Sequence, residues 1–188
     1  MTRQNGAYFD EEYLRQGSPT NITFAETLSR RDATSAAVTL AATGVELAVA
    51  IPLQAGDVVA NVTFVIGATA AVTPTAGYAV LRSPAGAKLV QSADFATTAR
   101  TANTAYTVAM TAAQLITTPG LYYIGLSFTA GTVPTVHGIT FGNAVMSGAI
   151  GLSIPILSQS HGSAVGAVAP ATIATPTTVV SFPYLVAT

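Results

Sequence analysis

The chain has 188 residues, a net charge of −1 and no cysteine, and 8% of its residues are charged while 50% are hydrophobic. An ordinary soluble domain carries roughly 25% charged residues. The lack of cysteine excludes disulfides, thiolate catalysis and cysteine-ligated metal centres. The length suits one domain with a single core.

The charged residues are unevenly distributed along the chain. Nine of them lie in residues 1–32, and none follows Arg100. Acid–base, nucleophilic and metal chemistry all need titratable groups, so this distribution disfavours most enzyme classes and predicts a non-enzymatic protein without cofactor. With no basic cluster beyond Arg30 and Arg31, it also disfavours a nucleic-acid partner.

Residues 1–37 are predicted to form an N-terminal arm, because the first 32 combine most of the charge with four of the aromatic residues. A short helix over 10–16 is expected there, and the segment either grips a neighbouring molecule or folds back on its own domain. The start of the chain has no apolar signal region, which predicts synthesis and assembly in a cytoplasm. The arm side chains expected to contact a partner are Tyr8, Phe9, Tyr13, Leu14, Arg15, Phe24, Arg30 and Arg31.

From residue 38 onward, apolar residues recur with the period of two that is typical of strands. In 58–66, the alternation puts Val58, Ala60, Val62, Phe64 and Ile66 on one face. Gly and Pro turns separate the segments and interrupt every apolar run that could cross a membrane as a helix. Further strands are predicted at 45–53, 77–83, 87–92, 105–110, 121–128, 136–141, 152–157 and 178–186, with a helical turn at 111–115.

Eight or nine short strands at this spacing indicate an all-β fold, an antiparallel β-sandwich of jelly-roll type spanning 38–188. In LITTPGLY (115–122), the spacing is typical of a tyrosine corner, which predicts that Tyr122 or Tyr123 packs structurally. Pro183, inside the last predicted strand, indicates an edge position or a bulge.

Few residues in the sandwich could carry chemistry. Ser160 and His161 stand together in SQSHGS, but serine catalysis also needs an orienting carboxylate, and every acid lies upstream, at Asp94 or earlier. His137 and His161 lack a nearby carboxylate for a metal, so both are expected to be polar loop residues. The acids Glu46, Asp57 and Asp94 are expected to be solvated turn residues rather than a calcium site.

Four segments stand out in order along the chain: IPLQAGDVVANVTFVIGATAAVTPTAGYAVLRSPAGAKLVQSAD (51–94), TANTAYTVAM (101–110), TTPGLYYIGLSFTAGTVPTVHG (117–138) and APATIATPTTVVSFPYLV (169–186). Together they resemble the β-sandwich virion proteins encoded by tailed phages of actinobacteria. The resemblance covers about residues 38–188. It implies a place in the virion as a head decoration, minor capsid or minor tail protein.

Composition and resemblance together lead to one leading expectation. The chain is expected to be a capsid decoration protein whose arm binds the major capsid protein or a neighbouring copy, and whose uncharged sandwich self-associates, most simply as a trimer. The alternative is a tail-fibre or receptor-binding module that recognises a host glycan. Glycan sites usually present exposed aromatics, whereas tryptophan is absent here and most sandwich aromatics lie in strands with a buried pattern.

Overall fold

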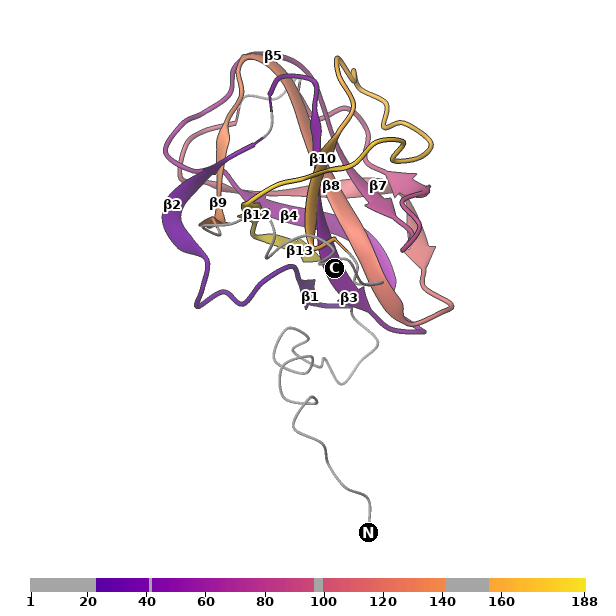
Figure 1. Cartoon of the computed structure of the whole chain (residues 1–188). Coiled ribbons are helices and arrows are strands. Elements are labelled where there is room, and N and C mark those ends of the chain that lie inside the picture. The colour runs from indigo at the N-terminus through magenta and orange to yellow at the C-terminus, as the bar shows by residue number, and fades with distance from the viewer. Residues whose placement is uncertain (1–22, 41, 97–99, 141–155) are drawn as a thin grey trace.

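A computed structural model describes residues 23–40, 42–96, 100–140 and 156–188 (Figure 1). Its regular elements are all strands, and every strand pairing is antiparallel, which confirms the predicted all-β class. None of the described residues forms a helix long and apolar enough to cross a membrane. The strands are β1 (Ala25–Glu26), β2 (Thr34–Thr39), β3 (Glu46–Leu53), β4 (Val58–Val65), β5 (Val72–Arg82), β6 (Lys88–Gln91), β7 (Ala105–Leu115), β8 (Gly120–Thr132), β9 (Thr135–Thr140), β10 (Ser158–His161), β11 (Thr177–Thr178), β12 (Ser181–Pro183) and β13 (Leu185–Ala187).

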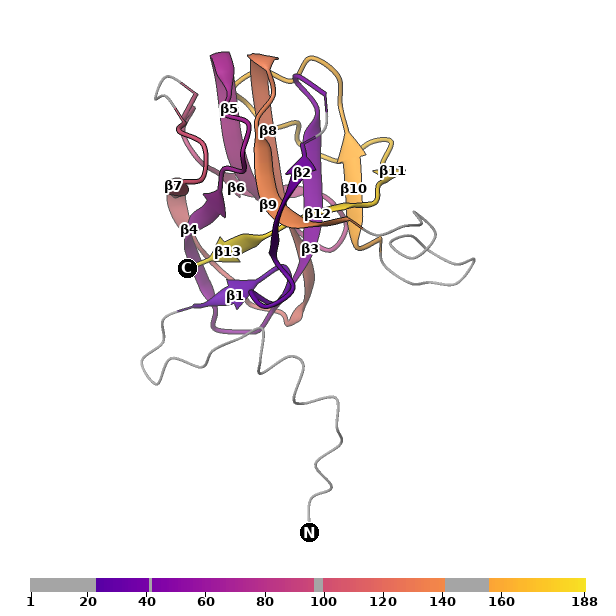
Figure 2. The ribbon, with the colours of Figure 1, turned by 90° about the vertical axis from the view of Figure 1, so that its left-hand side faces the viewer.

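These strands form three sheets with the orders β1-β13-β4-β7, β11-β10-β3-β8-β5-β6 and β12-β9-β2. Figure 2 shows β4 and β7 on one side of the molecule and β3 and β10 on the other. The arrangement is consistent with a β-sandwich. It contains more strands than predicted, and β5, β7 and β8 are longer than the strands predicted at 77–83, 105–110 and 121–128. The jelly-roll connection stays a prediction.

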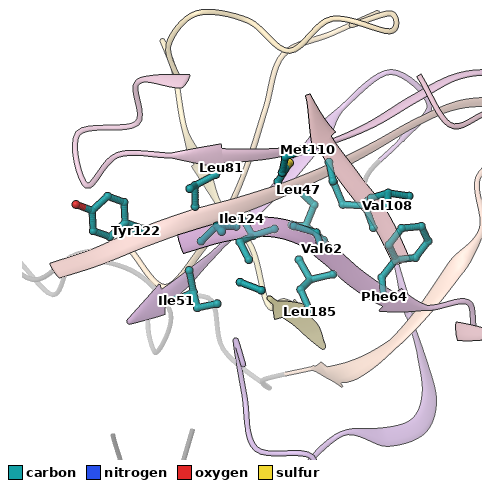
Figure 3. Close-up of a cluster of buried hydrophobic side chains, with 14 of the residues drawn as sticks. Leu47, Ile51, Val62, Phe64, Leu81, Val108, Met110, Tyr122, Ile124 and Leu185 are labelled. Atoms are coloured by element: carbon teal, nitrogen blue, oxygen red, sulfur yellow. The ribbon is translucent and has the colours of Figure 1, made fainter. Parts of the chain in front are cut away.

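The main core lies between the four-stranded and six-stranded sheets (Figure 3). Phe64 of β4 packs against Phe128 of β8, with ring centroids 6.1 Å apart in an edge-on arrangement. Apolar side chains from both sheets fill the rest, among them Leu47, Ile51, Val62, Leu81, Val108, Met110, Ile124 and Leu185. Folding buries these apolar side chains away from water, and this hydrophobic effect is the main force that holds the two sheets together.

Strand β4 departs from the strict alternation that its sequence suggests. Val62, Phe64 and Ile66 are buried as predicted, but nearer the start of the strand Val59 is buried while Val58 is only half-buried. The β4–β7 register shifts between Val59, which pairs with Gln114, and Asn61, which pairs with Ala109, so the ladder is bulged there and most of the unpaired residues lie in β7. A bulge inserts unpaired backbone and reverses which residues face the core.

Strand β7 continues through the segment predicted as a helical turn, so that prediction was wrong. Residues 111–115 extend the strand, and Leu115 pairs with Val58 of β4. The hydroxyl of Thr111 donates to the carbonyl of Gln91 at 2.9 Å, which attaches this part of β7 to the neighbouring sheet. Pairing with β4, together with this side-chain bond, outweighs the weak helical preference of a short alanine-containing segment.

Two local predictions near the strand ends are confirmed. The Tyr122 hydroxyl donates to the Thr118 carbonyl at 2.7 Å, as a tyrosine corner requires. Pro183 lies in β12, an edge strand of the three-stranded sheet. An edge strand tolerates proline because its missing N–H would point away from the ladder. The single strand predicted over 178–186 is instead divided among parts of β11, β12 and β13.

The sandwich begins earlier than the predicted boundary at residue 37. Strand β1 pairs with β13, and β2 pairs with β9. The Thr23 hydroxyl accepts a hydrogen bond from the Val58 N–H, at the start of β4. Residues 23–37 therefore belong to the sandwich, because the C-terminal strands and β9 need them as pairing partners. The helix predicted over 10–16 and most of the strand predicted over 152–157 lie outside the described residues.

Candidate functional site

Three of the predicted partner-contact residues lie together at the start of the described chain. The guanidinium of Arg30 stacks over the ring of Phe24, with 5.0 Å between its carbon and the ring centroid. Its Nε lies 2.5 Å from Oε1 of Glu26, a buried carboxylate that also accepts a hydrogen bond from the Tyr184 hydroxyl. Arg31 is exposed beside them. The other predicted contacts, Tyr8, Phe9, Tyr13, Leu14 and Arg15, lie outside the described residues.

Arg30 is held in position but remains accessible, since about half of its side chain, 51%, is exposed. Burial and the hydrogen bond to Glu26 raise the pKa of Tyr184, so this hydroxyl stays protonated and able to donate. A charged side chain that is already ordered loses little conformational entropy when a partner binds it. The turn at residues 29–32 is therefore a pre-organised polar contact point on the surface.

Elsewhere the described surface carries little charge. Five of the ten charged residues in the described ranges are buried: Glu26, Glu46, Asp57, Arg82 and Arg100. Among the exposed large hydrophobic side chains of those ranges, none is aromatic. The surface is accordingly dominated by neutral threonine, alanine and glycine, without the exposed rings on which sugars stack.

The second polar cluster is internal and lies on the side of the six-stranded sheet away from the main core. Arg82 of β5 binds Glu46 of β3 in a bidentate arrangement, with Nε to Oε1 at 2.7 Å and Nη2 to Oε2 at 2.8 Å. Tyr78 donates its hydroxyl to Oε2 at 2.9 Å. Nε2 of His161 lies 2.9 Å from Oε1, although its N–H does not point at that oxygen in hydrogen-bond geometry.

Burial opposes ionisation of Glu46 more than any other single influence, but the hydrogen bonds and charge of Arg82, together with His161 beside the carboxylate, outweigh it and hold the pKa of Glu46 below its ordinary value. Burial, reinforced by the neighbouring carboxylate, raises the pKa of Tyr78. The cluster thus contains an ionised carboxylate and a protonated phenol at neutral pH. Arg82 and Glu46 are both fully buried, so a substrate in solution has no access to them.

The chain between β10 and β11 covers this cluster. Arg82 donates through Nη1 to the carbonyl of Pro170 at 3.0 Å, and Lys88 donates through Nζ to the carbonyl of Ala169 at 3.0 Å. Gly125 of β8 lies directly beneath the carboxylate: a Cβ added there would come within 2.2 Å of Oε1 of Glu46. Only a glycine leaves room for the carboxylate at this position.

The arrangement does not assemble a hydrolase triad from Ser160 and His161. The two are neighbours on β10, and successive residues of a strand point to opposite faces. Both histidines lie in strands, His137 in β9 and His161 in β10, so the prediction that they are loop residues was wrong. Sheet pairing takes up their backbone, and His161 is drawn against the carboxylate of Glu46.

The three acids considered for calcium are separated in the structure. Glu46 binds Arg82, Asp57 accepts from the Gln54 N–H at 2.7 Å, and Asp94 accepts from the Gly77 N–H at 3.0 Å. Within the described ranges, no three acidic or histidine side chains gather as metal ligands. The prediction that Glu46 is a solvated turn residue was wrong. Glu46 and Arg82 each lie next to an apolar strand segment, and this position could have indicated that both are buried.

Comparison with models of protein families and with curated proteins gives no match to this chain.

Proposed function

We propose that the chain is a non-enzymatic virion structural protein of tailed phages, a capsid decoration protein that binds the major capsid shell and associates with copies of itself. The observation that carries this proposal is the near absence of charge from the described surface. Ten charged residues are described and half of them are buried. A neutral surface of this kind is favoured where much of it is covered by other subunits.

The shell contact is assigned to the N-terminal segment together with the turn that holds Arg30. Residues 1–22 precede Thr23, where the sandwich begins, and hold five of the fifteen charged residues of the chain and three of its fourteen aromatic residues. The pre-organised guanidinium of Arg30, stacked on Phe24, would fix the segment's base against an acidic group on the shell. The threefold sites of a capsid lattice accommodate the trimer expected from the sequence.

The test compares two truncated chains in co-sedimentation with shells assembled from the major capsid protein. Deleting residues 1–22 leaves every strand of the described ranges in place and should abolish or strongly weaken binding. Deleting residues 1–32 also removes β1, which pairs with β13, and should unfold the sandwich. Binding by the shorter deletion at full strength would refute the arm mechanism. Failure of the intact chain to bind shells would refute the decoration function.

The alternative function, a receptor-binding tail module, makes the opposite prediction in two assays. It requires a signal on a glycan array and labelling of the tail rather than the shell. The lack of exposed aromatic side chains in the described ranges gives a sugar little to stack on. A glycan-array signal from the intact chain would favour this function over decoration.

A further inference from the structure

Strand β7 is the outer strand of the four-stranded sheet and pairs with β4 on one side (Figure 2). On its other side, the pairing assigned between described residues is a single bridge from Met110 to Ser92. The first half of β7, residues 105–109, lies beyond that bridge. Ala105, Thr107 and Ala109 are all exposed.

The backbone groups of these three residues point away from β4. In an antiparallel ladder, hydrogen-bonded pairs alternate with pairs that are not hydrogen-bonded. The Ile66 N–H donates to the Thr104 carbonyl at 2.9 Å, so the next hydrogen-bonded pairs toward the middle of β7 involve Tyr106 and Val108. The N–H and C=O groups of the residues between them, centred on Thr107, are therefore directed outward. Among the backbone hydrogen bonds outside the strand ladders, none between described residues uses the N–H or C=O of Thr107.

The other sheet edges of the described fold are protected in ways that natural sheets commonly use. Strands β1 and β11 have two residues each, and β12 has three including Pro183. The ladder of β2 is interrupted by a register shift. The edge of β6 is covered by the chain between β10 and β11, where the Lys88 N–H donates to the Ala171 carbonyl at 2.8 Å. Among these edge strands β7 is the longest, and its sequence, AYTVAMTAAQL, is free of charge and proline.

We propose that the open edge of β7 pairs antiparallel with the same edge of a second copy, centred on Thr107, so that the two four-stranded sheets join across a twofold axis. The inference rests on the proposed self-association and names its contact. Thr107 would bond to its own counterpart, and Ala105 would pair with Ala109 of the other copy. In such a pair the central residue meets itself, so a charge there would repel.

A second copy of this chain suits the edge as a partner because the edge presents small, uncharged side chains to its own counterpart. The exposed side chains at 105, 107 and 109 are alanine and threonine, which let identical strands approach without steric conflict or like-charge repulsion. The edge covers about five residues, so its area falls well below the roughly 800 Å² per partner of a stable free-standing dimer. The contact is therefore weak in solution and strengthened where a shell holds many copies close together. Being twofold, it joins copies in pairs and is separate from any threefold arrangement.

The test uses the fact that the chain has no cysteine. In Thr107→Cys, the Cα atoms across the twofold pair would lie about 5.5 Å apart, within the span of a disulfide. Thr117→Cys is the matched control, since Thr117 is equally exposed but lies outside the strand. Under mild oxidation at high protein concentration, Thr107→Cys should form disulfide-linked dimers about tenfold faster than the control. Equal rates would overturn the proposal.

A second pair of variants measures association without a covalent bond. Sedimentation velocity over a concentration series should show weak dimers of the intact chain. Thr107→Lys should abolish them and Thr117→Lys should not. Dimers that persist unchanged in Thr107→Lys would overturn the proposed contact. Shell binding by the intact chain is measured separately, so failure of this contact and failure of the decoration function give different results.

Discussion

Removing the charge of Glu46 is the sharpest test of how the sandwich holds its buried ions. In Glu46→Gln the side chain keeps its size, but the carboxylate that neutralises Arg82 is gone. The guanidinium loses its two charge-assisted bonds of 2.7 and 2.8 Å. It cannot turn toward water, because its side chain is fully buried and its Nη1 is held by the carbonyls of Gly86 and Pro170.

The loss in the free energy of unfolding can be estimated from the cost of leaving Arg82 buried without its ionic partner. Breaking such a pair on one side costs about 3–5 kcal/mol. The amide oxygen of glutamine can still accept one hydrogen bond, but its NH₂ group would face either the Arg82 guanidinium or the Tyr78 hydroxyl, both of which donate to Glu46. We therefore expect the free energy of unfolding to fall by about 3–5 kcal/mol, which is a large part of the total for a domain of this size.

The assay is urea denaturation at pH 7, followed by circular dichroism, with Arg82→Met and the double variant Glu46→Gln/Arg82→Met measured alongside. The double variant removes the unpaired ion as well, so it should lose less stability than the two single variants added together. If Glu46→Gln costs less than about 1 kcal/mol, or if the single effects simply add, the account of a buried and mutually dependent ion pair is wrong.

Three further results are expected from the buried residues of the sandwich. Because the pKa of Glu46 is lowered in the folded chain, its contribution to stability should be complete above the ordinary value of 4.5 and decline as pH falls below it; the Glu46→Gln variant should show a flatter stability profile over that range in urea titrations. Gly125→Ala would place a methyl group against the carboxylate and should cost about 1–3 kcal/mol, measured by thermal denaturation, with no loss at all contradicting the close approach. Tyr122→Phe should cost about 1 kcal/mol in urea denaturation through loss of the bond to Thr118, and an unchanged midpoint would contradict it.

The all-β class could be predicted from the sequence because the alternation of apolar residues depends only on local pleating. In β4, the pattern correctly identified Val62 and Phe64 as core residues. It failed at Val59, because a bulge depends on how the partner strand is paired, and that information lies in distant residues. The same reason explains why residues 111–115 continue a strand instead of forming a turn.

The candidate sites were harder to predict than the fold. The contact between Arg30 and Phe24 joins residues close in sequence, and both were among the predicted contacts. The pairing of Glu46 with Arg82 brings together residues 36 positions apart, and a lone charge in an apolar segment does not reveal its partner. The prediction that residues 23–37 belong to an arm was wrong for a similar reason. Their charge is typical of an exposed segment, but their backbone pairs with distant strands, β9 and β13.

We propose above all that this chain is built into a virion and covers its shell. A density map of virions of the phage that encodes it tests this claim most directly. We expect density for the sandwich on the outside of the capsid, with its N-terminal segment against the major capsid protein. Density confined to the tail, or particles that lack the protein altogether, would contradict the account.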